Sequence, residues 1–144
     1  MRKRKYHQNY YKIRRPEKYK GNSSVVIYRS LWEKKTMEFF EENSHIQWWN
    51  SEGLVIPYMS IDRKAHRYYP DFIFLNSKNE TWVVEVKPYK ETIPPTTRQK
   101  NYQYAAITFV QNQLKWKAAK EFCKKQNIKF VVWTEKELKK MHIM

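Results

Sequence analysis

The chain of 144 residues is long enough for one domain with a single apolar core. It carries 29 Lys and Arg residues against 14 Asp and Glu residues, which gives a formal charge of +15, and 17% of its residues are aromatic. A positive charge of this size favours a polyanionic partner, above all a nucleic acid, whose bases can stack on aromatic side chains. An anionic membrane surface or an acidic protein is the alternative partner.

The composition also argues against several classes of protein. No apolar stretch approaches the roughly 20 residues of a membrane span, so we expect no membrane-spanning segment. Cys123 is the only cysteine, which rules out a disulfide within the chain and fits a reducing compartment. The four histidines show no zinc-ligand spacing with Cys123, and we expect no zinc site.

Residues 1–24 are basic and aromatic and show no sustained apolar periodicity. We expect a flexible arm here and place a single folded domain at residues 25–144. Two interpretations of the arm stay open: it becomes ordered on DNA or on a protein partner, or it is a basic tail with no such role.

A helix is predicted from Ser30 to about Asn43, because apolar residues recur there at the spacing of one helical face. Glu33 lies at the edge of that face, near the start of the helix. Residues 30–33 also have the pattern of a capping box, in which the Glu33 carboxylate would bond back to the Ser30 amide.

Apolar runs after this helix predict strands. The first two, residues 46–50 and 54–58, are separated by a turn at residues 51–53. Residues 60–67 are polar and are interpreted as a connection.

The next two predicted strands, residues 68–75 and 82–87, should form a β-hairpin. The polar loop between them, residues 76–80, is of the kind that joins antiparallel strands. If that loop is centred on Lys78, residues whose numbers sum to 156 face each other.

Two acids and an amine converge in this predicted hairpin. Asp71 lies opposite Glu85, with Cβ atoms about 5 Å apart. Lys87 shares the face of Glu85, whereas Val84 and Val86 point to the other face. Two carboxylates this close repel each other unless a cation lies between them, and a hard ion with oxygen ligands, such as Mg²⁺, fits.

The last third of the chain predicts an extended loop over residues 89–97, a long helix over residues 98–126, a strand over residues 128–133 and a short helix over residues 135–141 that begins at Thr134. Gln113 interrupts the apolar stripe of the long helix. We interpret it as a buried, hydrogen-bonded side chain, with a role at a functional site as the alternative.

Pro70-Asp71, followed fourteen positions later by Glu85-Val86-Lys87, resembles the motif of the PD-(D/E)XK nuclease superfamily. The order helix, three strands, helix, strand also resembles the core of that superfamily. Glu-x-Lys alone is weak, because it occurs twice more in the chain, but Asp71 is one of only two aspartates. The resemblance implies an α/β fold with a restriction-endonuclease-like core, in which helices flank a mixed β-sheet.

The same resemblance implies a Mg²⁺-dependent DNA endonuclease. Asp71 and Glu85 would bind one or two Mg²⁺ ions, for which Mn²⁺ could substitute, and the Val86 carbonyl would be a further ligand. Lys87 would orient or help to deprotonate the attacking water. Members of this superfamily often place an acidic residue of the first helix at the metal site, and Glu33 is the matching position here. That role competes with its role in the capping box.

Double-stranded DNA is the implied substrate, and basic residues near the site would contact its phosphates. These residues are Arg29, Arg63, Lys64, Arg67 and Lys90, together with Arg2, Lys3, Arg4 and Lys5 of the arm. Residues 60–67 can equally be an ordinary solvated loop.

Five strings resemble the small head completion nucleases of contractile-tailed phages; they are residues 16–21, 28–33, 48–54, 69–72 and 85–88. This resemblance implies processing of the ends of packaged phage DNA before the neck and tail attach. It also implies phage head, portal or neck proteins as partners, no membrane, and a location in the host cytoplasm during assembly or in the virion. Two other classes stay open: a transposon-end or junction nuclease on the same core, and a non-catalytic DNA-binding head-assembly protein.

Overall fold

The computed structural model describes residues 9–144, and its centre is a four-stranded mixed sheet. The strand order is β3 (Ile46–Ser51), β6 (Phe72–Asn76), β7 (Thr81–Val86) and β8 (Lys129–Trp133). β6 is antiparallel to β3 and to β7, whereas β7 and β8 are parallel. A parallel pair needs a long crossover, and the helix α2 (Tyr102–Lys125) provides it.

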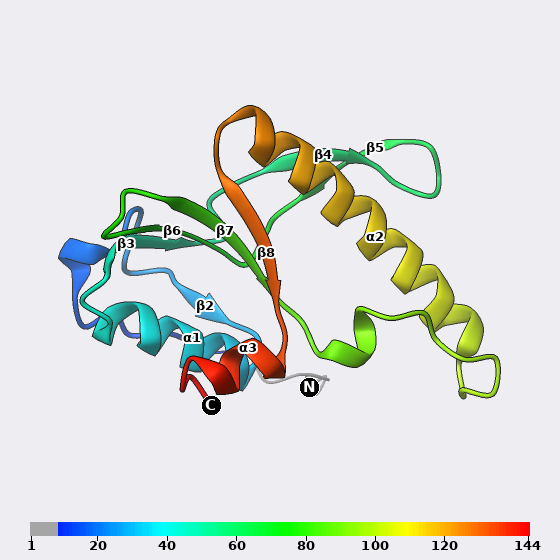
Figure 1. The fold of residues 1–144 in the computed structure, drawn as a ribbon, viewed down its shortest axis with the longest axis horizontal. Coiled ribbons are helices and arrows are strands. Elements are labelled where there is room, and N and C mark those ends of the chain that lie inside the picture. Colours follow the sequence, from blue (N-terminus) through cyan, green and yellow to red (C-terminus); the bar gives the residue numbers. More distant parts are fainter. Residues whose placement is uncertain (1–8) are drawn as a thin grey trace, which may run out of the picture.

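Helices lie on both sides of this sheet (Figure 1). α1 (Leu31–Glu42) and the short α3 (Glu135–Lys140) lie together on one side. On the other side, α2 packs on β8 and on a separate hairpin of β4 (Ile56–Met59) and β5 (Ala65–Tyr68). The order α1, β3, β6, β7, α2, β8 confirms the predicted α/β fold.

Two apolar clusters hold these layers together. In the first, Phe40 of α1 is fully buried and its ring centroid lies 5.2 Å from that of Phe72 and 5.3 Å from that of Phe74. The second cluster lies between α2 and the β4–β5 hairpin; its buried members are Ile56, Tyr58, Tyr68, Trp116 and Ala119. The sheet therefore separates a core beneath α1 from a core beneath α2.

The β6–β7 hairpin has the predicted register. Phe72 faces Val84 and Leu75 faces Thr81, so the numbers of paired residues sum to 156. Asn76 stabilises the connecting loop, because its Oδ1 atom accepts hydrogen bonds from the amides of residues 78 and 80 at 3.0 and 2.9 Å.

The predicted strand over residues 68–75 is divided between two sheets. Tyr68 is the last residue of β5, and β6 begins only at Phe72. Pro70 lies between them and cannot donate a ladder hydrogen bond, so the chain leaves one sheet and enters the next there. Residues 60–67, which we expected as a polar connection, supply part of β5. The first three residues of β5 are exposed, which explains why no alternating pattern marked this strand.

The long helix differs from its prediction at two points. It begins at Tyr102 rather than at Arg98, after Asn101 with a left-handed φ of 65°. The interpretation of Gln113 is wrong, because this side chain is exposed and its neighbour Asn112 is buried. Among the described residues, no helix has both the length and the apolar character needed to cross a membrane.

Residues 9–24 pack on the domain, although we assigned them to a flexible arm. β1 (Asn9–Tyr10) pairs with β2 (Ile27–Tyr28). The hydroxyl group of Tyr11 donates to the buried Glu41, which also accepts from the amides of Arg14 and Arg15 at 2.8 Å each. Such specific hydrogen bonds need no apolar periodicity, so composition did not indicate them. The first eight residues lie outside the described part of the chain.

Lys18, in the short 3₁₀ helix η1 (Pro16–Lys18), joins this N-terminal segment to the end of α1. Its Nζ atom donates to the carbonyl oxygens of Phe40, Glu41 and Asn43 at 2.7, 3.2 and 2.9 Å. A cation at this end also interacts favourably with the helix dipole.

Replacing Lys18 with Met should therefore lower the free energy of unfolding by about 1–3 kcal/mol, because three carbonyl groups lose a charged donor. Urea unfolding followed by tryptophan fluorescence measures the change. Lys35→Met, at an exposed position of α1, is the matched control and should change it by less than about 0.5 kcal/mol. Equal losses in the two variants would contradict an anchoring role for Lys18.

Candidate functional site

Asp71 and Glu85 meet at one end of the two central strands, just before β6 begins and near the end of β7. The Asp71 amide donates to Oε1 of Glu85 at 3.3 Å, and the Val86 amide donates to Oδ2 of Asp71 at 2.8 Å. The two carboxylates thus lie together, as the hairpin register predicts.

Both carboxylates are poorly hydrated. Glu85 is 7% exposed and Asp71 is half-buried. Burial raises the pKa of Asp71 well above its usual range, and the negative charges of Glu85 and Glu33 raise it further. Burial also raises the pKa of Glu85, against the opposing effect of the Lys87 ammonium. A cation placed between the carboxylates would offset this repulsion.

Lys87 lies on the same side as Glu85, and its Nζ atom is 3.8 Å from Oε2 of Glu85. Val84 and Val86 contribute instead to the apolar cluster beneath α1. The predicted alternation of side chains along this strand is therefore confirmed.

The backbone of Val86 also faces the carboxylates. The Lys87 amide donates to the Trp133 carbonyl in β8 at 3.0 Å. Because backbone groups of successive strand residues point to opposite sides, the amide and carbonyl of Val86 point towards β6. The hydrogen bond from the Val86 amide to Asp71 agrees with this direction.

Two further residues belong to the site, and the sequence analysis missed both. The hydroxyl group of Tyr68 donates to Oε1 of Glu85 at 2.9 Å. The Nζ atom of Lys115, from α2, lies 5.8 Å from the centroid of the Tyr68 ring. The positive charge of Lys115, like that of Lys87, opposes the rise in the Glu85 pKa. No local pattern distinguished them, since the chain holds 11 tyrosines and 29 basic residues.

Glu33 lies at the N-terminus of α1 and close to Asp71, whose pKa its charge raises. The Ser30 hydroxyl group caps the helix by accepting from the Glu33 amide at 3.1 Å. The Glu33 carboxylate accepts from the Arg29 amide at 3.3 Å, not from the predicted Ser30 amide. Burial raises the pKa of Glu33 as well. Glu33 therefore takes part in hydrogen bonds at the start of α1 and also lies close to Asp71.

Arg29, a predicted DNA contact, forms an ion pair with Glu52. Glu52 follows β3 with a left-handed φ of 54°, and its amide donates to the Asp71 carbonyl at 3.1 Å. This pair joins the segment before α1 to the end of β3, beside the carboxylates.

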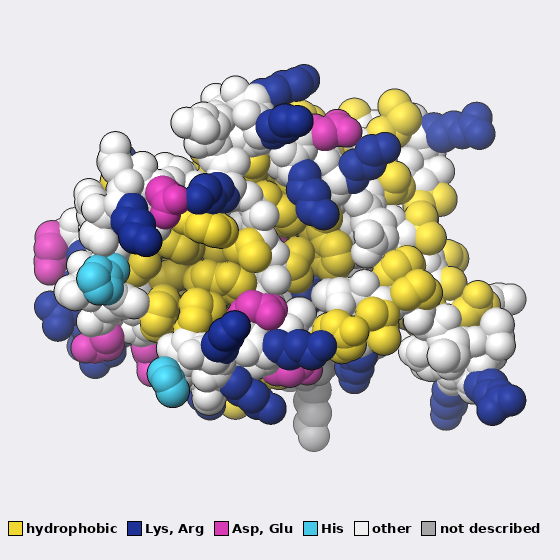
Figure 2. Space-filling model, viewed as in Figure 1, with side chains coloured by type: hydrophobic (Ala, Val, Ile, Leu, Met, Phe, Trp, Pro, Cys, Tyr) yellow, Lys and Arg dark blue, Asp and Glu magenta, His cyan; other side chains and the backbone are white. Residues whose placement is uncertain are grey.

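The other predicted DNA contacts within residues 9–144 lie on exposed segments. Arg63 and Lys64 lie in the turn of the β4–β5 hairpin, Arg67 lies on β5, and all three are exposed. Arg2, Lys3, Arg4 and Lys5 lie outside the described residues. Figure 2 shows Lys and Arg side chains spread around the periphery of one face rather than gathered in one patch.

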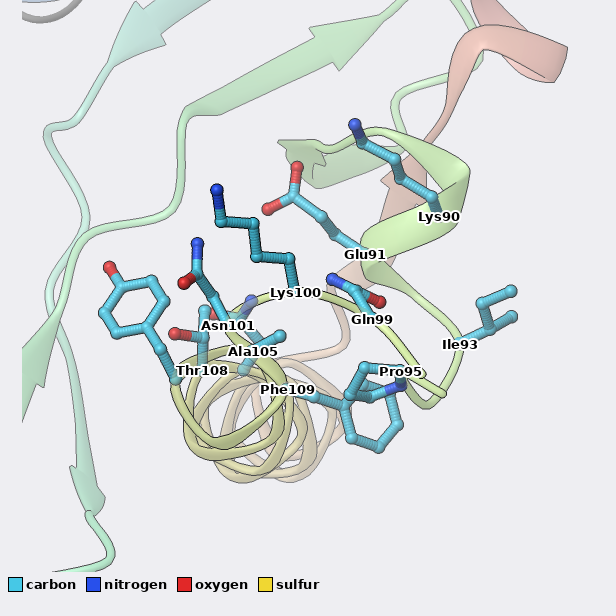
Figure 3. Close-up of a pocket in the computed structure, with 12 residues that line it drawn as sticks. Lys90, Glu91, Ile93, Pro95, Gln99, Lys100, Asn101, Ala105, Thr108 and Phe109 are labelled. Carbon is cyan, nitrogen blue, oxygen red and sulfur yellow. The ribbon is translucent and has the colours of Figure 1, made fainter. Parts of the chain in front are cut away.

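A cavity of about 460 Å³ opens beyond Lys87, between the 3₁₀ helix η2 (Tyr89–Glu91), the loop that follows it and the first half of α2 (Figure 3). Lys90, Glu91 and Lys100 lie on its rim, and Phe109 lines it from α2. Lys90 is thus placed beside this cavity, although the carboxylate pair does not line it.

A small number of side chains at the site could provide oxygen ligands to a metal ion. No three His, Cys, Asp or Glu side chains within residues 9–144 are grouped closely enough to hold a metal ion. Oδ1 of Asp71 and Oε2 of Glu85 accept no hydrogen bond from the described residues. Together with the Val86 carbonyl they are hard oxygen donors, a set that fits Mg²⁺ better than zinc.

Comparisons with known proteins show which family the chain belongs to. A family model described as "TnsA-like endonuclease N terminal" matches residues 43–135, which contain β3 to β8 and the Asp71, Glu85 and Lys87 positions. The chain is also similar to the head completion nuclease of Enterobacteria phage T4. It is 37% identical to that protein over 130 residues, which cover 85% of this chain and 87% of the relative.

Replacing Asp71 with Asn should stabilise the metal-free protein near neutral pH. The pKa of Asp71 is raised in the folded state, so its effect on stability turns unfavourable as pH rises above the unfolded value of about 3.9 and through the folded pKa. Asn still accepts from the Val86 amide but carries no charge. With EDTA present, we expect a melting temperature about 2–4 °C higher, which corresponds to about 1 kcal/mol.

Asp62→Asn is the matched control, because it removes the only other aspartate. The Lys64 amide and then His66 hold the pKa of Asp62 below its usual value, so its charge favours the folded state. This variant should not melt at a higher temperature. A lower melting temperature for Asp71→Asn, or an equal rise in both variants, would contradict the proposed repulsion at the site.

Proposed function

This chain belongs to the TnsA-like endonuclease N-terminal family and to the family of the T4 head completion nuclease, and from this membership we propose that it is a Mg²⁺-dependent DNA endonuclease. The family has a restriction-endonuclease-like fold. The proposal assigns Pro70-Asp71 and Glu85-Val86-Lys87 to a PD-(D/E)XK site. The observation that carries it is the meeting of Asp71 and Glu85 at one end of the two central strands, with Lys87 at 3.8 Å from Glu85.

The residues that would hold the ion are Asp71 and Glu85 through their free oxygens, with the Val86 carbonyl as a further ligand. Glu33 would add charge from α1. When bound, Mg²⁺ supplies Lewis-acid polarisation of the phosphate and a lower pKa for bound water. The raised pKa of Asp71 supports this assignment, because after burial its largest cause is the negative charge of Glu85, and a divalent cation would offset that repulsion.

Lys87 has the role of an electrostatic partner for the reacting groups. Its ammonium group lies beside Glu85 and is partly exposed, so it can contact a phosphate or a water molecule at this end of the strands. A donor at this place orients the attacking water and stabilises negative charge that develops at phosphorus.

The biological substrate in this proposal is packaged phage DNA. The similar T4 protein is named a head completion nuclease, and its length is largely covered by this chain. The chain would process DNA ends before the neck and tail attach, in the host cytoplasm during assembly or in the virion. Head, portal or neck proteins would then be its partners.

A transposon-end endonuclease is the second candidate, because the matching family model is described as TnsA-like. A preference for one DNA sequence would favour this candidate. Cleavage of linear DNA without sequence preference would favour the processing of DNA ends.

Three single substitutions test the site: Asp71→Asn, Glu85→Gln and Lys87→Ala. Each should lower Mg²⁺-dependent cleavage of linear, circular or branched DNA by at least about 100-fold, because each removes a metal ligand or a charged donor. Fluorescence anisotropy should show DNA binding largely retained. Asp62→Asn should cleave like the wild type, and a fully active Glu85→Gln variant would refute the assignment. Metal-independent binding without cleavage by the wild type would support a non-catalytic head-assembly protein.

The β4–β5 hairpin should contribute to DNA binding. Replacing Arg63, Lys64 and Arg67 together with Ala should lower the slope of log affinity against log salt by about 2–3, the value for three lost phosphate contacts. The matched triple variant replaces Lys120, Lys124 and Lys125 with Ala. These exposed residues lie near the end of α2, towards the start of β8 and hence away from the carboxylates. An equal fall in slope for both triple variants would contradict a specific role for the hairpin.

A further inference from the structure

One side chain, Tyr68, connects the β4–β5 hairpin to the carboxylate pair. Its hydroxyl group donates to Oε1 of Glu85 at 2.9 Å, and the Asp71 amide donates to the same oxygen at 3.3 Å. Oε2 of Glu85 remains, 3.8 Å from the Nζ atom of Lys87. The two oxygens of this carboxylate therefore have different surroundings.

Packing rather than the site itself fixes the position of the Tyr68 hydroxyl group. Tyr68 is 4% exposed and lies in the apolar cluster with Trp116 and Ala119 of α2. It pairs with Ile56 across the hairpin, and Lys115 lies over its ring. A donor held by a packed core keeps its direction when the carboxylate alone would rotate.

We propose that Tyr68 is a positioning residue, which holds Glu85 so that Oε2 faces the metal ion and the substrate. The inference rests on the proposed function, because it concerns the same metal site. Residues that hydrogen-bond to a metal ligand fix its orientation and raise the affinity for the metal. The hairpin that carries Arg63, Lys64 and Arg67 is thereby linked to the carboxylate that would bind the ion.

The chain contains a close control for this role. Tyr58 lies on β4 of the same hairpin and is 6% exposed, and Lys115 lies 6.0 Å from its ring centroid. Its hydroxyl group accepts a hydrogen bond from Nε2 of Gln111 at 3.3 Å instead of donating to Glu85. Tyr58→Phe and Tyr68→Phe thus each remove one buried hydroxyl group from the same small core, but only the second removes a donor to a carboxylate.

The first measurement is Mn²⁺ binding by isothermal titration calorimetry without DNA. We expect Tyr68→Phe to weaken Mn²⁺ binding about 10-fold and Tyr58→Phe to leave it unchanged. The second measurement is DNA cleavage at several Mg²⁺ concentrations. Tyr68→Phe should need about 10-fold more Mg²⁺ for half-maximal rate, with the KM for DNA unchanged. Thermal unfolding should show both variants folded at the assay temperature, which separates positioning from a loss of folded protein.

Equal Mn²⁺ affinity and equal Mg²⁺ dependence in the wild type and Tyr68→Phe would overturn the inference, while cleavage by the wild type would leave the proposed function intact. Equal weakening in both variants would also overturn it, because the effect would then belong to the hairpin core. A wild-type protein that neither binds Mn²⁺ nor cleaves DNA would refute the proposed function, and the inference with it.

Discussion

The pairing of β6 with β7 determines where Asp71, Glu85 and Lys87 lie relative to one another. Because side chains alternate along a strand, a slip of one residue would place Asp71 opposite a residue of the other face. The loop bonds of Asn76 and the burial of Phe72 beneath α1 both oppose such a slip. The register therefore holds Asp71 against Glu85 although their charges repel each other.

Three separately packed parts of the chain meet at this pair. The central sheet supplies the two carboxylates. The hydrogen bonding between β7 and β8 extends beyond Val86 to the amide of Lys87. The segment before α1 is joined to the end of β3 by the Arg29–Glu52 ion pair. The β4–β5 hairpin and α2 form their own core and reach the carboxylate pair through Tyr68. The geometry of the site thus depends on contacts that are distant in sequence.

Much of the site could be predicted from the sequence because its signals are local. The loop length sets the hairpin register, and strand alternation gives the face of Lys87. The division of the predicted strand at Pro70 could not be predicted, since β5 is mostly exposed and pairs with a strand that precedes it. Tyr68 was missed because its partner, Glu85, is 17 positions away in the chain and belongs to a different sheet. Gln113 is exposed and its neighbour Asn112 is buried. An error of one residue in the predicted buried face of the helix was therefore enough to select the wrong side chain.

Burial of a carboxylate does not by itself indicate function, and Glu41 provides the comparison. Glu41 is 1% exposed, but both of its oxygens accept hydrogen bonds: Oε2 from the Tyr11 hydroxyl group, and Oε1 from the amides of Arg14 and Arg15. Its charge is satisfied within the fold and holds the N-terminal segment on α1. Asp71 and Glu85 each leave one oxygen without a hydrogen bond from the described residues. Such a destabilising arrangement is typical of sites that an ion or a substrate completes, and this difference separates the structural carboxylate Glu41 from the Asp71–Glu85 pair.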